Sequence, residues 1–498
     1  MKHKNSLSQL LQFTAIYLIL TTTSPAQDFS GMRAEEIYQN LCATCHGAEF
    51  EGGLAGSLAD GEWIHGNSDE QIQHSITDGI PDKGMEAFGD VLTVSQVRGL
   101  VVLIREREQE EHYRTATYPV PDPENVTRTR YHAYRVEILT EGLHTPWAVA
   151  FLPDGRKLVT ERSGPLRIID ADNRLDPEPV EGIPQAVFNG PEGGMMDVAL
   201  HPDFEKNGWI YLALVDGLRD ENGDSITETA VVRGRIDGHR WVDQEWIYKA
   251  DPKSYTRSGA HYGTRIAFDN GYIYFAIGQR GDRDDPQDLS SPNGKIFRLY
   301  DDGRIPEDNP FVDDPNALAG IWSYGHRNPQ GLTIDEETHD LYETEHGARG
   351  GDEFNLILKG RNYGWPVITH GMNYNGTPIT PYTEMEGMEQ PLVHWTPSIA
   401  PCGLDQYRGT AFPQWDGDIL AGSLRAQELH RLRVRDGTVV EEEVILKGIG
   451  RVRDVRIGPE GYIYLLTNTD PDRLVRLLPA DVYKHQLEDI SKEPANKM

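Results

Sequence analysis

The sequence is short of cysteines and of basic residues. Cys42, Cys45 and Cys402 are the only thiols in 498 residues, too few for the disulfide framework that stabilises small secreted domains. Lys and Arg number 48 against 79 Asp and Glu, for a formal net charge of −31. That balance argues against nucleic acid as a partner, because phosphate binding needs a basic surface. An acidic surface favours solubility, and it also suits cations or a basic protein partner.

Long apolar runs are lacking too. The apolar stretch Leu10–Leu20 is too short to cross a bilayer core of about 30 Å as a helix. Lys2 and Lys4 precede it, and Ala26 stands just before Gln27, which is the pattern of a secretory signal peptide. We therefore predict an exported protein, periplasmic or secreted, without stable membrane insertion. An uncleaved membrane tether is the alternative.

The chain changes character near residue 112. Before it, Ala34–His46 and Thr93–His112 have the apolar spacing of amphipathic helices, and Thr93 or Ser95 can cap the second helix. Residues 113–130 carry three prolines and no apolar periodicity, which is typical of an exposed linker. The expected parts are a signal peptide (1–26), a helical domain (27–112), a linker (113–130), a second, larger domain (131–480) and a polar tail (481–498).

From residue 131 onward, short apolar stretches alternate with turns rich in Gly, Asp, Asn and Pro, which is typical of a β protein. A unit of two apolar strands joined by a turn recurs six times, and its first strands are expected near residues 149, 198, 266, 332, 410 and 455. Such intervals suit four-stranded blades with loops. We predict a mainly β fold, a six-bladed β-propeller preceded by a small all-α domain. A pair of β-sandwiches is the alternative.

Two of the three cysteines fall in the segment LCATCHGAEFEGG, residues 41–53. In an exported protein, C-x-x-C-H is the attachment motif of c-type haem. We predict thioether bonds from Cys42 and Cys45 and an axial iron ligand at His46. A redox-active C-x-x-C pair is the alternative.

A second axial ligand is expected at Met85, because a Met thioether raises the potential of haem iron. The segment GIPDKGMEAFGDVL resembles the Met-bearing loop of class I cytochrome c domains, and the resemblance covers residues 31–110. Glu86 stands where that loop usually has proline. His65 and His74 are alternative ligands, and a role for Met85 in the core is also open.

Six stretches over residues 147–478 are similar to the soluble aldose and glucose dehydrogenases that depend on pyrroloquinoline quinone (PQQ), a family that includes sorbosone-dehydrogenase-like proteins. In the family's order they are PEGGMMDVALHPDF, GAHYGTRIAF, GKIFRL, YGHRNPQGL, EHGARGGDEFNLILKGRNYGWP and RVRDVRIGPEGYIYLLT. The resemblance implies oxidation of a sugar by PQQ, with the cofactor held partly by Ca²⁺.

The resemblance also assigns roles to single residues. His261 would be the base that takes the hydroxyl proton, and Arg327 would stabilise negative charge at the reactive quinone oxygens. Arg451 and Arg453, two positions apart on an expected strand, would bind the PQQ carboxylates on one face. Arg425 stands where the family usually has lysine, so it keeps the charge and changes the geometry.

Calcium would be bound by the backbone carbonyls of Gly347 and Ala348, since Ca²⁺ prefers oxygen ligands. Ala348 replaces a proline of the family, which a carbonyl ligand tolerates. Asp352, Glu353 and Tyr363 are candidates for a second, structural Ca²⁺. Ordinary turn carboxylates are an equally good interpretation of this group.

Three further positions bear on the sugar pocket. Trp395 would stack on the planar quinone. Glu192 stands at the family's glutamine position, which touches substrate or quinone. Ala260 replaces the acidic residue that precedes the base in the glucose enzymes. The family's glucose specificity is therefore not carried over to this chain.

The sequence thus predicts an exported quinohaemoprotein that oxidises an aldose, or a related aldehyde or alcohol, with PQQ. Electrons would pass to its own haem c and then to an external cytochrome or oxidase. A sorbosone-type or oligosaccharide oxidoreductase is one alternative. A sugar-binding propeller without quinone, attached to an electron-transfer cytochrome, is the other, although a lectin has no use for arginines arranged to hold a trianion.

Overall fold

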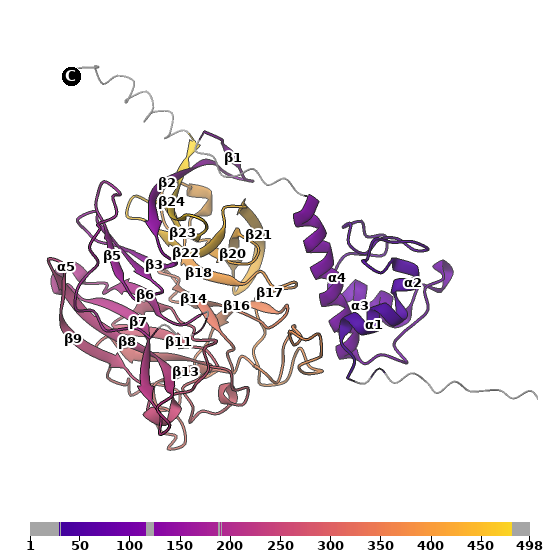
Figure 1. Ribbon diagram of the computed structural model, residues 1–498, viewed down its shortest axis with the longest axis horizontal. Coiled ribbons are helices and arrows are strands. Elements are labelled where there is room, and N and C mark those ends of the chain that lie inside the picture. Colours follow the sequence, from indigo (N-terminus) through magenta and orange to yellow (C-terminus); the bar gives the residue numbers. More distant parts are fainter. Residues whose placement is uncertain (1–28, 30, 116–123, 188–189, 191, 481–498) are drawn as a thin grey trace, which may run out of the picture.

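The structure is a computed structural model that describes residues 29, 31–115, 124–187, 190 and 192–480. The expected signal peptide and polar tail lie outside these residues. A helical domain and a larger β domain lie side by side (Figure 1). No helix among the described residues has both the length and the apolar composition needed to cross a membrane.

The described part of the N-terminal domain is helical, as expected. Its helices are α1 (Ala34–Leu41), α2 (Ala43–His46), α3 (Asp69–Asp78), the 3₁₀ turn η1 (Pro81–Lys83) and α4 (Val94–Thr115). Thr93 and Gln96 cap α4 reciprocally: the Thr93 hydroxyl accepts from the Gln96 N–H (3.3 Å) and the Gln96 side chain accepts from the Thr93 N–H (2.9 Å).

Helix α3 is the element that apolar spacing did not indicate. Its signal is polar: Ser68 and Gln71 form a capping box around the first turn. Ile72 and Ile76 then turn one face of the helix into the domain core. That core also receives Leu100 and Ile104 of α4, so the long helix is buried along one side.

The β domain is a six-bladed propeller, which confirms the predicted fold. The first blade contains β3 (Pro146–Phe151), β4 (Lys157–Glu161) and β5 (Leu166–Ile169). The second contains β6 (Met195–Leu200), β7 (Ile210–Arg219), β8 (Ser225–Asp237) and β9 (Arg240–Tyr248). The third contains β10 (Ile266–Asp269), β11 (Tyr272–Ile277), β12 (Lys295–Tyr300) and β13 (Ile321–Tyr324). The fourth blade contains β14 (Pro329–Ile334), β15 (Leu341–Glu345), β16 (Asp352–Ile357) and β17 (Val393–Trp395). The fifth contains β18 (Pro401–Gln406), β19 (Ile419–Ser423), β20 (Glu428–Arg435) and β21 (Thr438–Lys447). The sixth contains β22 (Arg451–Ile457), β23 (Ile463–Asn468), β24 (Asp472–Pro479), β2 (Ala133–Leu143) and β1 (Thr127–Arg128). Short helical turns between strands are α5 (Phe204–Asn207), η2 (Pro252–Ser254), η3 (Asp285–Gln287) and η4 (Pro413–Trp415).

The sixth blade closes the ring. Strand β2, from the start of the domain, pairs antiparallel with β24 from its end, in a register that runs from Tyr134 opposite Pro479 to Leu143 opposite Asp472. Closure of this kind satisfies the backbone of a strand that would otherwise be an exposed edge. It also ties the chain that enters from the cytochrome domain to the last blade.

One expected strand is displaced. The segment near residue 410 forms a loop with the 3₁₀ turn η4, and the inner strand of the fifth blade is β18, Pro401–Gln406, instead. Phe412 and Trp415 account for the apolar signal there, because they are buried in this turn with their rings stacked at 4.8 Å. Apolar residues that anchor a turn look like a short strand when only local spacing is read.

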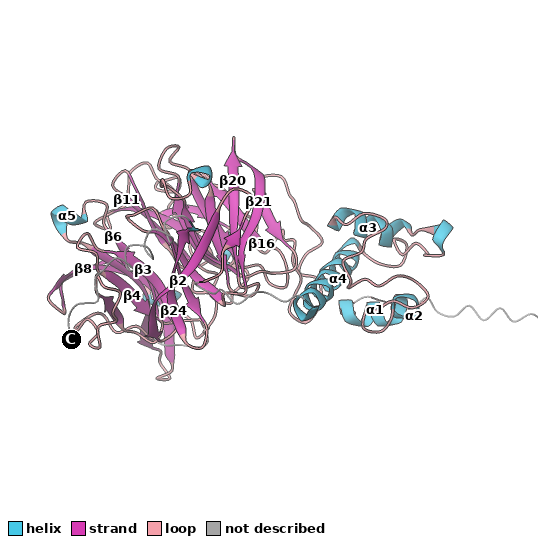
Figure 2. Ribbon diagram, turned by 90° about the horizontal axis from the view of Figure 1, so that it is seen from above, coloured by secondary structure: helices cyan, strands magenta, loops and turns pink. Residues whose placement is uncertain are grey.

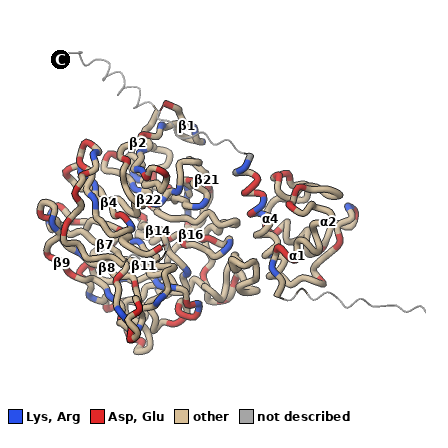
Figure 3. Tube along the Cα trace, viewed as in Figure 1, with Lys and Arg blue, Asp and Glu red and all other residues tan. Residues whose placement is uncertain are grey.

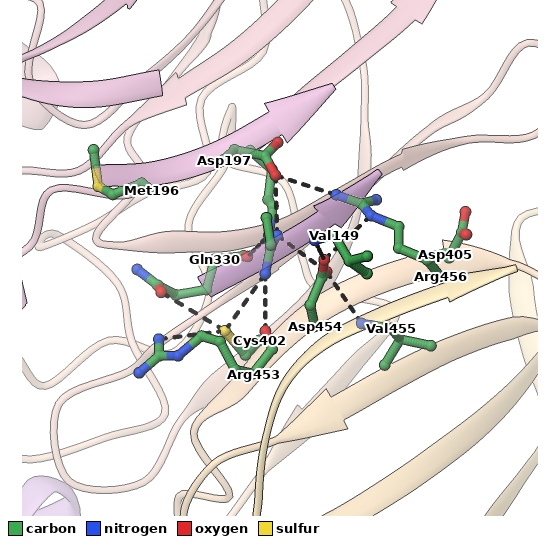
Figure 4. Close-up of polar contacts among 12 residues, drawn as sticks. Val149, Met196, Asp197, Gln330, Cys402, Asp405, Arg453, Asp454, Val455 and Arg456 are labelled. Carbon is green, nitrogen blue, oxygen red and sulfur yellow. Dashed lines mark hydrogen bonds and ion pairs between the residues drawn. The ribbon is translucent and has the colours of Figure 1, made fainter. Parts of the chain in front are cut away.

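The propeller axis is filled by buried charges. Arg265, just before β10, is 1% exposed and pairs with Asp197 of β6 at 3.1 Å and Asp454 of β22 at 3.0 Å, both fully buried. Arg456 contacts the same two carboxylates, and Figure 4 shows it converging with Asp197 and Asp454. Arg265 also donates to the carbonyl oxygens of Gln330 and Arg453. One side chain thereby links four blades.

Replacing this side chain should destabilise the propeller strongly. We expect Arg265→Leu to cost about 3–5 kcal/mol, because two buried carboxylates lose a partner. Tryptophan fluorescence during urea unfolding measures the shift. Arg304→Leu, at an exposed pair with Asp302, is the control and should cost less than about 1 kcal/mol. Equal shifts in the two variants would contradict this account of the axis.

Candidate active site

The candidate site lies at one end of the propeller, where inner strands begin and their neighbours end. Glu192, His261 and Arg327 come shortly before β6, β10 and β14, and Arg451 opens β22. Each inner strand is antiparallel to its neighbour, so the residues that follow β4, β11 and β15 return to this same end. The topology therefore gathers residues that are far apart in the sequence.

The backbone around His261 is tightly held. His261 has a left-handed φ of 55°, which is uncommon outside glycine, and its N–H donates to Glu192 Oε2 at 2.6 Å. A Cβ atom at Gly278 would lie 2.2 Å from the His261 carbonyl oxygen, so only glycine allows this approach. These contacts fix where the imidazole points.

Two contacts settle which nitrogen of the His261 ring carries the proton. Arg327 Nη2 lies 3.1 Å from Nε2, and the side-chain amide of Gln279 lies 2.7 Å from Nδ1. A guanidinium only donates, so Nε2 accepts and the proton sits on Nδ1. The structure places Gln279 Nε2 toward Nδ1 and leaves Gln279 Oε1 buried without a partner among the described residues. Exchanging the two amide atoms, which are hard to tell apart by position alone, lets Oε1 accept from Nδ1–H.

His261 is held neutral. Burial, followed by the charges of Arg327, His346 and Arg280, lowers the pKa of His261 to about 2. Desolvation and nearby cations both disfavour the imidazolium. The ring therefore presents an unprotonated Nε2 throughout the neutral pH range, as a proton acceptor requires.

Arg327 is a buried cation, and no carboxylate among the described residues lies within ion-pair distance of its guanidinium. It is 4% exposed, and its Nη1 donates to the carbonyl oxygens of His346, at 2.8 Å, and Gly347. Its Nη2 lies 3.4 Å from the hydroxyl of Tyr374, and its Nε has no hydrogen-bond partner within the described part of the chain. Such a group has unused capacity to bind an anion.

Arg451 and Arg453 add to this positive region. Burial, then the charges of Arg327 and Arg453, and also that of Arg451, lower the pKa of His346 to about 3, so all three guanidinium groups act electrostatically on one imidazole. Partial burial and Arg453 lower the pKa of Arg451. Arg453 contacts Cys402 Sγ at 3.6 Å and Asn468 at 3.3 Å. Among the described residues, neither guanidinium has a carboxylate within ion-pair distance.

Arg162 belongs to the same group and was not identified from the sequence. Burial, then Arg453 and Arg451, lower its pKa, while Glu192 raises it. Its position directly after β4 was the available signal, since that strand end faces the site. We call Arg162, Arg327, Arg451 and Arg453 the arginine cluster. Acidic residues, by contrast, are spread along α4 and the outer loops (Figure 3).

The expected calcium region holds a buried acidic cluster. His326, Glu343 and Glu345 bring ligand atoms within 4.8 Å of one another, and burial, then Glu345, raises the pKa of Glu343. The two glutamates alternate along β15 and so face one side, which is a signal that sequence analysis missed. Asp352, in contrast, is engaged by the N–H groups of Gly347 and Ala400 and by the Ser398 hydroxyl.

The remaining calcium candidates have ordinary partners in the structure. Ala348 is buried. Glu353 accepts from the Asn355 amide at 3.2 Å. The Tyr363 hydroxyl bonds Leu356 and Leu358 backbone groups, and its ring stacks on His326 at 4.6 Å.

Two further candidate residues have their printed side-chain partners outside the arginine cluster. Trp395 is buried between blades, where its indole N–H donates to Glu442 at 2.8 Å and its ring contacts His430 edge-on. Arg425 is 42% exposed, and its Nη1 lies 3.8 Å from Glu106 of α4. The structure therefore directs Trp395 into the propeller core and Arg425 toward the cytochrome domain.

The helical domain brings the expected haem residues to one hydrophobic cluster. Cys42 and Met85 both pack against the core that contains Tyr38 and Leu100. His46 Nδ1 lies 2.9 Å from the Gly56 carbonyl oxygen, so Nδ1–H is the donor and Nε2 is left for iron.

The surface near the motif also suits haem. The side chains of Leu54 and Ile64 are 84% and 86% exposed, an apolar surface that a porphyrin can cover. His74 instead pairs with Asp78 at 2.8 Å and is 80% exposed, and His65 is also exposed. Helix α2 lies on the side of its domain away from the propeller (Figures 1 and 2).

Fold and site together define a six-bladed propeller oxidoreductase joined to a cytochrome c domain. The sequence profile of the Glucose / Sorbosone dehydrogenase family matches residues 143–476, and the chain belongs to that family. The profile of the Cytochrome C oxidase, cbb3-type, subunit III family matches residues 30–104, which covers the C-x-x-C-H motif.

Relatives and solved structures match the propeller. Aldose sugar dehydrogenase YliI of Escherichia coli is 41% identical over 352 residues, which are 69% of this chain and 92% of the relative. The apo-form structure of the soluble aldose sugar dehydrogenase of E. coli superposes with a TM-score of 0.65 at 38% identity, covering 70% of this chain and 99% of that one. The PQQ-bound aldose sugar dehydrogenase of Streptomyces coelicolor gives 0.56 at 28% identity, covering 69% and 98%.

The protonation of His261 can be measured without substrate. Histidine ¹⁵N NMR should show the Nδ1–H tautomer of His261, unchanged as pH falls from 8 to 4. Gln279→Glu should raise the pKa of His261, because a carboxylate beside Nδ1–H stabilises the imidazolium. Gln390→Glu, at an exposed position, is the matched control. An Nε2–H tautomer in the wild type would contradict the assigned hydrogen bonds.

Proposed function

We propose that the protein is an exported, PQQ-dependent aldose dehydrogenase that uses its own haem c as the first electron acceptor. The observation that carries the proposal is the arginine cluster. In a chain of net charge −31, Arg327, Arg451 and Arg453 share one end of the propeller with a neutral His261 and have no carboxylate partners among the described residues. PQQ is a tricarboxylate, and such guanidinium groups suit it.

The chain's groups divide the task of holding this cofactor. When bound, PQQ supplies a hydride acceptor, Ca²⁺ a fixed positive charge, and haem c a one-electron carrier. Arg451 and Arg453 are placed to bind carboxylates at the rim. Arg327 lies deeper, beside His261, and would stabilise negative charge there. The Gly347 and Ala348 carbonyls are the proposed Ca²⁺ ligands, and the first already accepts from Arg327.

His261 is the proposed base. Its Nε2 would accept the proton of the sugar hydroxyl, and the hydrogen bond of Nδ1–H to Gln279 keeps the ring in the tautomer that can do so. Glu192 holds the His261 backbone at 2.6 Å, so this departure from the family's glutamine has a positioning role. The sorbosone-type and oligosaccharide alternatives share the same base and differ in the sugar bound.

The cytochrome domain would deliver electrons outward. Cys42, Cys45, His46 and Met85 are the proposed haem residues, and α2 faces away from the propeller (Figure 2). A haem attached there is accessible to an external cytochrome or oxidase. We propose a periplasmic or secreted location, which the amino-terminal sequence pattern and the c-type haem motif support.

A reconstitution experiment tests the enzyme against the sugar-binding alternative. Purified haem-containing protein is given PQQ and Ca²⁺ and then a panel of aldoses, and reduction of the haem is followed by its visible spectrum. We expect at least one aldose to reduce the haem. A sugar-binding propeller would leave the haem oxidised with every sugar.

In the same assay His261→Ala should slow haem reduction by about 10²–10⁴-fold, the usual contribution of a positioned base. The haem spectrum and PQQ binding should not change, because the variant leaves the arginine cluster intact. His239→Ala, at an exposed histidine paired with Asp176, is the matched control. A rate equal to wild type would remove His261 from the proposed mechanism.

Binding of PQQ itself tests the arginine cluster. We expect Arg451→Gln and Arg453→Gln each to weaken the PQQ affinity by about 10- to 100-fold, the loss expected for a hydrogen bond between charged groups. Quenching of tryptophan fluorescence during titration with PQQ gives the Kd. Arg435→Gln, at an exposed site remote from the cluster, should bind as wild type does. Unchanged affinity in both cluster variants would overturn the assignment.

A further inference from the structure

The cytochrome domain forms hydrogen bonds with one loop of the propeller. We call residues 369–382, between β16 and β17, the docking loop. Arg98 of α4 is 7% exposed, and its guanidinium donates to the carbonyl oxygens of Thr369 at 2.7 Å and Pro381 at 2.9 Å. One side chain therefore ties the two ends of the loop together. The Ser95 hydroxyl makes a further contact with the Thr380 carbonyl oxygen at 3.4 Å.

The middle of the docking loop enters the cytochrome core. Met372 is 2% exposed and belongs to the hydrophobic cluster of the helical domain. A Cβ atom at Gly99 of α4 would lie 3.7 Å from its sulfur, so the loop packs directly on this helix. The Ala34 N–H also donates to the Gly376 carbonyl oxygen at 3.0 Å. Apolar burial and backbone hydrogen bonds thus both hold the loop against the helices.

The same loop reaches the candidate active site. Tyr374, two residues after Met372, places its hydroxyl 3.4 Å from Arg327 Nη2. Its side chain is 70% exposed, so it stands at the open side of the site. Neighbouring Asn373 accepts from Arg283. Only one residue separates a side chain in the cytochrome core from one beside the proposed catalytic arginine.

A second loop is held in the same way. Arg349 directly follows the proposed calcium ligands Gly347 and Ala348. Its guanidinium pairs with Glu106 of α4 and Glu35 of α1, each at 2.6 Å. Its backbone N–H and carbonyl also exchange hydrogen bonds with Met372, both at 3.0 Å. The cytochrome domain, the calcium loop and the docking loop therefore form one connected unit.

We propose that the docked cytochrome domain is a structural part of the quinone and sugar site: it positions Tyr374 and the Gly347–Ala348 carbonyls against Arg327. Arg98 and Glu106 are then positioning residues that act through the two loops, and Tyr374 contacts the bound sugar or cofactor. The inference rests on the proposed function. If the proposal is correct, weakening the contacts between the cytochrome domain and the two loops weakens cofactor and sugar binding even when electrons do not travel through the haem.

The first test needs neither cofactor nor substrate. Hydrogen exchange of residues 369–382 and 346–351 is measured in full-length, haem-containing protein without PQQ. We expect Arg98→Ala and Glu106→Gln to speed exchange at least tenfold in these segments, because the contacts that order them are lost. Arg114→Ala, at an exposed arginine in the last turn of α4, is the matched control. Exchange equal to wild type in both variants would overturn the inference.

The second test measures binding and turnover. For the same variants we expect the Kd for PQQ and the KM for an aldose to rise about three- to tenfold with an artificial acceptor that bypasses the haem. Tyr374→Ala should raise the KM without changing exchange in α4. A change confined to the rate of haem reduction would contradict the proposal, because the domain would then serve only as an electron carrier. If the wild type binds no PQQ, the proposed function fails, and the exchange result alone decides whether the domain orders the two loops.

Discussion

The pairing of Arg265 with Asp197 and Asp454 at the propeller axis is the interaction on which the rest depends. Removing these charges from water is costly, and only the complete set of partners offsets that cost. The strands that carry them must therefore converge in one register. Because Arg265 also donates to the carbonyl oxygen of Arg453, the same network holds the backbone of one residue of the arginine cluster. The axial network therefore contributes both to stability and to the position of that residue.

The charge of the candidate site is opposite in sign to the net charge of the chain. Acidic residues outnumber basic ones by 79 to 48 along the chain and recur along α4 and in many loops (Figure 3), while the arginine cluster brings positive charge to one end of the ring. A region with one sign of charge attracts ligands of the other sign. The same environment keeps His261 neutral, because nearby cations and burial both disfavour its imidazolium. The proposed anion binding and the proposed base chemistry would thus depend on one arrangement.

The two domains are held together by direct contacts as well as by the chain that joins them. Helix α4 contacts backbone carbonyl oxygens of the docking loop and the Arg349 side chain of the loop that follows β15. Both loops also contact Arg327. Helix α2, with the C-x-x-C-H motif, faces the other way (Figure 1). The cytochrome domain therefore has one side committed to the propeller and another that is open to a partner, which suits a carrier between a bound substrate and an external acceptor.

The sequence by itself determined whatever depends on local spacing: the C-x-x-C-H motif, helix α4, the count of blades, and the arginines and histidine that match a known family. The tertiary structure decided what depends on distant partners: closure of the ring by β2, the inner strand β18 in place of a strand near residue 410, the inclusion of Arg162, and the contacts of Trp395 with Glu442 and of Arg425 with Glu106. The physical reason is that spacing records which face of one element is buried. Which groups meet there is decided by the register and order in which separate strands pack.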